Sequence, residues 1–214
     1  MNAALFDREV DVEAPGGPWV MVIACGAIAR EVLAVIDLNG WTHVTLRCLP
    51  GKLHNYPARI PEAVREQIHK ARSRYRSIFV AYGDCGTGGA LDRVLAEHGV
   101  DRLPGDHCYA FFAGVDRWLA MHERDPATFY LTDFLCRHFE RFVVKGFKLD
   151  THPELLPIVF GNYRRLVYLS QKDDPALVEL ARSAADYLGL AFEHVRTGFG
   201  DLAPALVAAA EGTR

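Results

Sequence analysis

Residues 76–99, RSIFVAYGDCGTGGALDRVLAEHG, decide the fold class of this 214-residue chain. An apolar run predicts a buried strand, and the glycine-rich turn after it leads into a segment with apolar residues at helical spacing. Strand–turn–helix units of this kind build parallel sheets, because two parallel strands need a crossover connection between them. The stretch therefore predicts an α/β fold.

The same alternation continues on both sides of this stretch. Before it, strands are predicted at 19–27 and 43–50 and helices at 27–40 and 61–75, with an irregular, proline-containing loop at 50–61. After it, the pattern predicts a weak strand or turn at 100–103, a helix within 104–123, strands at 128–133, 164–171 and 190–198, and helices at 135–147, 175–189 and 201–212. We expect a Rossmann-like, mainly parallel sheet with helices on both faces.

The domain organisation follows from composition along the chain. Residues 1–18 are acidic and interrupted by two prolines, which predicts a flexible leader. Residues 19–214 then form one α/β domain. This domain is either a single continuous sheet or a pair of pseudo-equivalent lobes, at about 19–125 and 126–214.

Composition and charge exclude several classes of protein. Half of the residues are hydrophobic and 24% are charged, so a full core can form without disulfides. The net charge is only −3 and the basic residues are scattered, which argues against a nucleic-acid surface or a polybasic membrane patch. No apolar run reaches the roughly 20 residues of a membrane span, and the acidic start is unlike a signal peptide. We expect a cytoplasmic protein.

The five cysteines are unlikely partners for disulfides in a reducing compartment, so their positions matter. Cys25 follows the first predicted strand, Cys48 ends the second, Cys85 follows the third and Cys108 lies in the next loop. Open α/β sheets bind ligands at the carboxyl ends of their strands. These four cysteines are therefore the predicted metal ligands, whereas Cys136, inside a predicted helix, is expected in the core.

Two histidines and a glycine-rich turn complete the candidate site. His54 and His107 are the candidate catalytic residues, either as a ligand or as a proton carrier beside the metal. Gly86, Thr87 and Gly88 are the candidate cofactor-binding residues, because backbone N–H groups in such a turn can approach an anion or a thiolate closely. The turn lacks the Lys-Ser/Thr ending of a P-loop, which argues against a nucleotide.

The identity of the metal remains open at this point. Thiolate and imidazole ligands together favour zinc, while four thiolates would also accept an iron–sulfur cluster. The cysteine spacing matches neither the close CxxC pairs of zinc ribbons nor a ferredoxin run.

Several separate motifs resemble one protein family. They are IACGAIAREV (23–32), LHNYPARIPEAV (53–64), FVAYGDCGTGGALD (79–92), LPGDHCYAFFAG (103–114), TFYLTDFL (128–135) and FGNYRRLVYL (160–169). Together they resemble the bacterial and archaeal family catalogued as domain of unknown function 1638, from about Trp19 to about Phe199. The resemblance implies a stand-alone cytoplasmic protein found alongside corrinoid proteins and methyltransferases of methylated amines and betaines. The motif positions of the family fall on Cys25, His54, Asn55, Cys85, Gly86, His107 and Cys108.

Three functions are compatible with this pattern. The first is a zinc–thiolate protein of one-carbon metabolism, acting on a small-molecule substrate as a methyltransferase-type enzyme or as an accessory protein to corrinoid methyltransferases. The second is a non-enzymatic protein that binds a metal, a cluster or a corrinoid partner. The third is a metal-free enzyme of the racemase type, in which Cys25 and Cys85 exchange a proton with the substrate.

Overall fold

The computed structural model describes residues 9–17 and 19–212, which fall into two compact units. Unit 1 comprises residues 1–111 and 199–214, and unit 2 comprises residues 112–198. The boundary therefore lies near residue 111, earlier than the lobe boundary expected near 125. The last helix of the chain also returns to unit 1 instead of completing the second lobe.

Unit 1 is built on a five-stranded sheet in the order β1-β3-β2-β4-β5. Four strands are parallel: β2 (Val20–Cys25), β3 (Val44–Leu49), β4 (Ser77–Ala81) and β5 (Asp101–Arg102). The short strand β1 (Val10–Val12) runs antiparallel to β3 at the edge of the sheet. The central strands are almost entirely buried, as expected for parallel strands covered on both faces.

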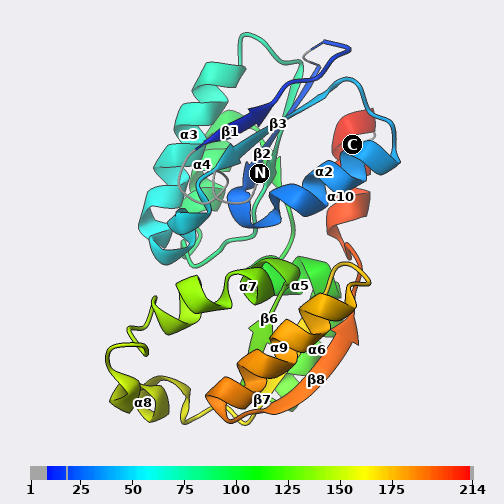
Figure 1. Cartoon of the computed structure of the whole chain (residues 1–214). Coiled ribbons are helices and arrows are strands. Elements are labelled where there is room, and N and C mark those ends of the chain that lie inside the picture. The colour runs from blue at the N-terminus through cyan, green and yellow to red at the C-terminus, as the bar shows by residue number, and fades with distance from the viewer. Residues whose placement is uncertain (1–8, 18, 213–214) are drawn as a thin grey trace. The chain divides into compact units, whose positions relative to one another are not determined.

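Helices cover both faces of this sheet (Figure 1). On one side lie α2 (Ala29–Leu38) and α10 (Leu202–Glu211), and on the other lie α3 (Ile60–Ala71) and α4 (Ala90–His98). Short 3-10 turns precede α2 and α3, namely η1 (Gly26–Ile28), η2 (Gly51–Asn55) and η3 (Pro57–Arg59). Burial recurs at helical spacing along α3, and α4 ends at Gly99, whose φ of +60° suits the left-handed C-cap. The return of α10 to unit 1 follows from its packing against α2 and β4.

Part of the expected flexible leader is ordered. Residues 10–12 pair with β3, and the Arg47 guanidinium holds the Asp11 carboxylate through two hydrogen bonds of 2.7 Å. Gln67 of α3 accepts a further hydrogen bond from Arg47 at 2.9 Å. This charged cluster anchors β1. The acidity and the prolines of residues 1–18 had predicted a flexible segment here instead. Residues 1–8 and 18 of the expected leader lie outside the described residues.

Unit 2 contains a three-stranded parallel sheet in the order β6-β7-β8. Its elements are β6 (Thr128–Leu131), β7 (Arg165–Ser170), β8 (Ala191–Arg196), α6 (Val115–Arg124), α7 (Asp133–Arg137), the π-helical turn η4 (Glu140–Val144), η5 (Pro153–Leu155), α8 (Leu156–Phe160) and α9 (Pro175–Leu188); α5 (Cys108–Ala113) spans the boundary between the units. The helix expected at 135–147 is divided, because His138 leaves the helical region at φ −121° and ψ 20°. Within the described residues, no helix combines the length and the apolar character needed to cross a bilayer.

A buried hydrogen-bond network holds unit 2 together at the end of its sheet. The Asp133 side chain is fully buried, and its Oδ1 accepts hydrogen bonds from the Tyr168 hydroxyl at 2.7 Å and the Gln171 backbone N–H at 2.9 Å. In return, the Asp133 N–H donates to Gln171 Oε1 at 2.8 Å. The Arg137 guanidinium lies 3.6 Å from Asp133 Oδ2 and offsets its charge. The network therefore joins the start of α7 to the end of β7.

We predict that Asp133→Ala lowers the free energy of unfolding by about 2–4 kcal/mol, because it leaves two buried donors without an acceptor. Asp150→Ala is the matched control, since Asp150 is an exposed aspartate in the same unit, and it should change stability by less than about 0.5 kcal/mol. Urea denaturation followed by circular dichroism measures both values. Equal midpoints for the two variants would show that the network does not stabilise unit 2.

Candidate functional site

The candidate site lies at the carboxyl edge of the sheet in unit 1. The chain passes from β2 to β3 on one side and then returns past β2 to β4 on the other side. Such a reversal of direction is a topological switch point, where open α/β sheets bind their ligands. In this unit the switch point lies at the ends of β2 and β4.

Three cysteines lie at this edge. Cys25 is the last residue of β2, Cys85 lies in the turn after β4, and Cys108 is the first residue of α5. All three are free thiols that are partly exposed as residues. Cys25 raises the pKa of Cys85, and both Cys25 and Cys85 raise the pKa of Cys108, so the structure brings these three sequence-predicted ligands into one neighbourhood.

Backbone hydrogen bonds bring the segments of Cys85 and Cys108 together. The Asp84 N–H donates to the Gly105 carbonyl at 3.1 Å, and the Cys85 N–H donates to the Asp106 carbonyl at 2.6 Å. Residues 103–106 therefore run alongside the end of β4, and Cys108 follows two residues later. The position of Cys85 itself is unusual, because its φ of +52° lies in the left-handed region that a residue other than glycine seldom adopts.

Gly83 makes this close approach possible. A Cβ atom at residue 83 would lie 3.0 Å from the Gly105 carbonyl oxygen and 3.0 Å from the backbone N and Cα of His107. These are backbone atoms that cannot rotate away. The turn after β4 therefore requires glycine at this position for a steric reason, independent of any ligand.

The three thiols are protonated at neutral pH. Burial is the largest cause in each case: it raises the pKa of Cys85 to about 12, raises that of Cys25, and raises that of Cys108 well above its usual value. Neighbouring thiols add to the effect, since Cys25 raises the pKa of both Cys85 and Cys108. A neutral thiol is a poor ligand and a poor nucleophile. The thiols of this edge therefore need a cation or a base before they can act.

Each of the three sulfurs also faces a backbone donor. The Ala27 N–H donates to Cys25 Sγ at 3.4 Å. A hydrogen bond from the Gly83 N–H lowers the pKa of Cys85, whereas burial raises it. The sulfur of Cys108 faces its own backbone N–H and the next one along α5. Backbone N–H groups directed at sulfur favour the thiolate, which is the form that binds metals.

Tyr82 is a member of this neighbourhood that the sequence analysis did not identify. Only 1% of the residue is exposed, and its hydroxyl is buried without a hydrogen bond of standard geometry. The Cys25 thiol interacts with this hydroxyl, and burial followed by the charges of Cys25 and Cys85 raises the pKa of Tyr82 well above its usual value. The available signal was its place at the predicted strand end, three residues before Cys85.

Cys48 lies on the opposite face of the sheet from Cys25. In a parallel ladder, paired residues point to the same face and successive residues alternate. Cys48 pairs with Ala24, whereas Cys25 pairs with Leu49. The register therefore directs the side chains of Cys48 and Cys25 to opposite faces of the sheet, which argues against a shared ligand set, although Cys25 is near enough to raise the pKa of Cys48. Burial raises the pKa of Cys48 to about 12, in keeping with a core position.

Cys136 lies in unit 2 and is buried, as expected for a core residue. Burial is also the largest cause that raises its pKa.

The turn at 84–89 uses its donors internally. The Asp84 carboxylate accepts hydrogen bonds from the Thr87 hydroxyl, from the Gly88 N–H at 3.0 Å and from the Gly89 N–H at 2.8 Å. Although burial opposes it, these bonds lower the pKa of Asp84. The expectation that Thr87 and Gly88 bind a cofactor is thus corrected in part, because a side chain of the turn already occupies their donors. Gly86 instead packs against the loop of His54, since a Cβ atom added at residue 86 would lie 3.4 Å from Pro57 Cγ.

Both candidate histidines lie on segments next to the thiols. His54 belongs to η2, in the same loop as Pro57, and the residue is exposed. Partial burial of its ring lowers the pKa of His54, which keeps the imidazole neutral and able to accept a proton at pH 7. His107 directly precedes Cys108, and its ring packs edge-on against Tyr109 with 5.1 Å between centroids.

The side chains of this edge do not form a preassembled metal site. Among residues 9–17 and 19–212, no group of three or more histidine, cysteine, aspartate or glutamate side chains is arranged to hold a metal ion. Cys25, Cys85 and Cys108 are neighbours whose sulfurs do not yet share one centre. Metal binding here would require at least side-chain rotation.

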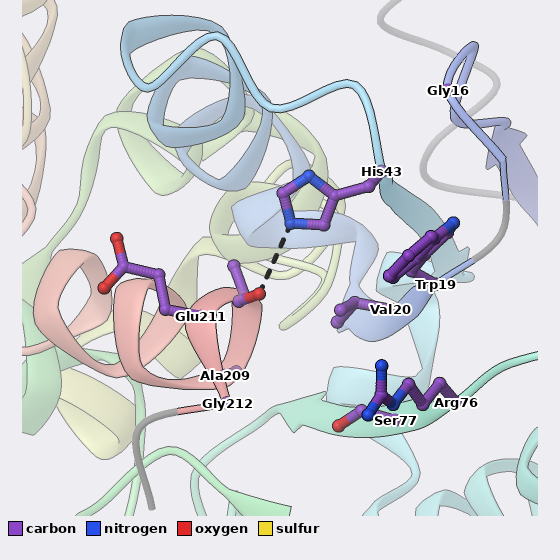
Figure 2. A pocket seen from close by; sticks show the side chains of 10 residues that line it. Gly16, Trp19, Val20, His43, Arg76, Ser77, Ala209, Glu211 and Gly212 are labelled. Carbon is purple, nitrogen blue, oxygen red and sulfur yellow. Dashed lines mark hydrogen bonds between the residues drawn. The ribbon is translucent and has the colours of Figure 1, made fainter.

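A large pocket of unit 1 lies elsewhere. It has a volume of about 740 Å³ and is lined by residues that precede the strands, including Trp19, His43 and Arg76, and by the end of α10 (Figure 2). His43 Nε2 contacts the Ala210 carbonyl at 3.3 Å on its rim. None of the lining residues is a cysteine. We place the candidate site at the carboxyl edge because three thiols gather there, whereas the polar side chains that line this pocket, His43, Arg76, Ser77 and Glu211, include no thiol.

We predict that Gly83→Ala increases the rate at which Cys85 and Cys108 react with an aromatic disulfide reagent by about tenfold or more, because residues 105–107 must move to admit the methyl group. Gly99→Ala is the control. At the Gly99 φ of +60°, an alanine is strained by about 1 kcal/mol, but its Cβ meets no atom within 4 Å. Equal thiol reactivity in the two variants would show that Gly83 does not maintain the approach of the two segments.

Comparisons with known proteins give a family model and distant solved structures. The search of curated proteins gives no match. Among solved structures, the chain is similar to the NocB thioesterase domain, crystallised as a covalent complex with a fluorophosphonate nocardicin G analog, at 14% identity over 94% of this chain and 98% of that one. The TM-score is 0.34, which supports no inference about fold or function. Residues 48–206 match the family model described as "Protein of unknown function (DUF1638)", and because this match covers most of the sequence, the chain belongs to that family.

Proposed function

We propose that this chain is a cytoplasmic metal–thiolate protein that binds zinc through Cys25, Cys85 and Cys108 and acts in one-carbon metabolism. One observation carries the proposal: three thiols from separate segments are neighbours at the switch point of a parallel sheet, each facing a backbone N–H. The strand order around β2 also supports a Rossmann-like description of unit 1.

The chemistry of the donors fits zinc. Thiolates are preferred zinc ligands, and a centre with three protein ligands keeps a fourth position for water or substrate, as catalytic zinc sites do. Bound there, zinc would lower the pKa of a substrate thiol and leave it a good nucleophile. A cluster of iron and sulfide is the alternative occupant, because it also binds thiolates.

The histidines have a natural role beside such a centre. His54 is neutral at pH 7 because burial lowers its pKa, so it can accept the proton that a substrate thiol loses. His107 lies next to Cys108 in sequence and is the second candidate for this transfer. Neither needs to be a ligand for the proposal to hold.

The class of reaction is inferred from the family and not from the geometry. The resemblance described above implies an association with corrinoid proteins and methyltransferases. We therefore propose methyl transfer, with the chain acting as the enzyme or as an accessory protein of a corrinoid partner. The high pKa of Cys25 and Cys85 makes metal-free proton exchange between them the weaker hypothesis, because neither thiol is a base at pH 7.

We predict that untagged protein purified without oxygen carries about one zinc per chain, measured by elemental analysis. Cys25→Ser, Cys85→Ser and Cys108→Ser should each weaken zinc binding by at least about 100-fold, because each removes a ligand. Cys48→Ala and Cys136→Ala are matched controls, since the ladder register directs Cys48 to the opposite face of the sheet from Cys25 and Cys136 is buried in unit 2. Both variants should keep their zinc.

Two other results would change the proposal. If the purified protein is brown and contains iron and sulfide, the proposed occupant becomes an iron–sulfur cluster bound by the same thiols. A protein that stays metal-free after incubation with zinc and with iron and sulfide would contradict a metal centre and return the cysteines to packing or thiol chemistry.

We predict that zinc binding at pH 7 releases about three protons per chain, one from each thiol. The pKa of each thiol is raised, so each is protonated below its folded pKa and must lose its proton to become a ligand. The zinc affinity should therefore rise by up to about 1000-fold per pH unit between pH 6.5 and 8. Calorimetry in buffers of different ionisation enthalpy gives the proton count. Release of no proton would exclude these cysteines as ligands.

A further inference from the structure

We propose that Tyr82 is a positioning residue of the thiolate centre, and that its hydroxyl donates a hydrogen bond to the Cys25 sulfur when a metal ionises that sulfur. This inference rests on the proposed function, because it concerns the same centre. It adds a residue that is neither a ligand nor one of the candidate histidines.

The sheet register places the two side chains next to each other. Ile23 pairs with Val80 and Ala24 pairs with Ala81 in the parallel ladder of β2 and β4. The following residues are Cys25 and Tyr82, so both extend from neighbouring strands toward the face of Ile23 and Val80. Both residues belong to, or pack against, the hydrophobic cluster on that face.

The Tyr82 hydroxyl has unused hydrogen-bonding capacity. It is buried, and the described residues offer it no hydrogen bond of standard geometry. Burying a hydroxyl without a partner is unfavourable, so an unsatisfied one at a candidate site needs an explanation. A neutral thiol is a weak acceptor and satisfies it poorly.

A metal-bound thiolate would complete the interaction. A phenol keeps its proton at neutral pH and is therefore a donor. Its hydrogen bond to an ionised sulfur is charge-assisted and stronger than one to a thiol. The bond would fix the direction of Cys25 Sγ and withdraw electron density from it, as hydrogen bonds to ligating sulfurs do. The Ala27 N–H already donates to the same sulfur, so Cys25 would become a thiolate with two donors.

Tyr75 provides a matched comparison within the same unit. It belongs to the same hydrophobic cluster, is 8% exposed, and also has a buried hydroxyl without a hydrogen bond of standard geometry. It lies before β4, at the opposite end of that strand from Tyr82. Replacing either tyrosine by phenylalanine removes one buried hydroxyl and keeps the ring. Only one of the two changes removes a donor to the centre.

The test uses the full chain loaded with cobalt(II), whose thiolate-to-metal charge-transfer band reports the electron density on the sulfurs. We expect Tyr82→Phe to move this band to lower energy and to weaken cobalt binding by about 10- to 100-fold. Tyr75→Phe should leave both the band and the affinity as in the wild type. In a Cys25→Ser background, Tyr82→Phe should have little further effect on affinity, because its partner is gone.

The outcomes separate this inference from the proposed function. A wild-type band that Tyr82→Phe leaves in place would overturn the role of Tyr82 and keep the metal centre. An equal shift in Tyr75→Phe would also overturn it, since general loosening of the core would then be the cause. A wild-type protein without any thiolate band would contradict the metal centre itself, and the role of Tyr82 with it.

Discussion

The candidate site depends on one backbone constraint, the attachment of residues 103–106 to the turn after β4. The Cys85 N–H donates to the Asp106 carbonyl at 2.6 Å, and Gly83 leaves room for this approach because it has no side chain. Without this attachment, the segment of Cys108 would be an ordinary loop leading to α5. Cys85, which makes this contact, also has a positive φ, so a residue in a seldom adopted backbone conformation lies where the two segments join.

Much of the fold could be predicted from the sequence, because its signals are local. The strand–turn–helix pattern at 76–99 predicted β4 and α4, and the apolar runs predicted β2 and β3 close to their observed bounds. The parts that the sequence did not predict depend on contacts between distant residues. The edge strand β1 exists because Arg47 binds Asp11, 36 positions earlier. The return of α10 to unit 1 depends on its packing against α2, which no local pattern encodes.

The candidate site could be predicted only in outline. Strand ends identified Cys25, Cys85 and Cys108, because the direction of parallel strands brings their carboxyl ends to one edge. The side-chain face of Cys48 requires the ladder register, and a shift of one residue would reverse it. The glycine-rich turn was misleading for a different reason. Its donors are satisfied by Asp84, a residue of the same turn, and sequence alone gives no measure of that internal competition.

Burial and ionisation oppose each other at this edge, and that opposition limits its possible chemistry. Packing against the core makes the charged form of each thiol unfavourable, while the backbone donors at Cys25, Cys85 and Cys108 are directed as a thiolate requires. A cysteine that only fills the core does not require hydrogen-bond donors at its sulfur. Conversely, burial of this degree would destabilise a thiol that is permanently ionised. A cation that arrives with its ligands protonated reconciles the two, because it supplies the charge that the surrounding protein lacks and gives the buried Tyr82 hydroxyl an acceptor.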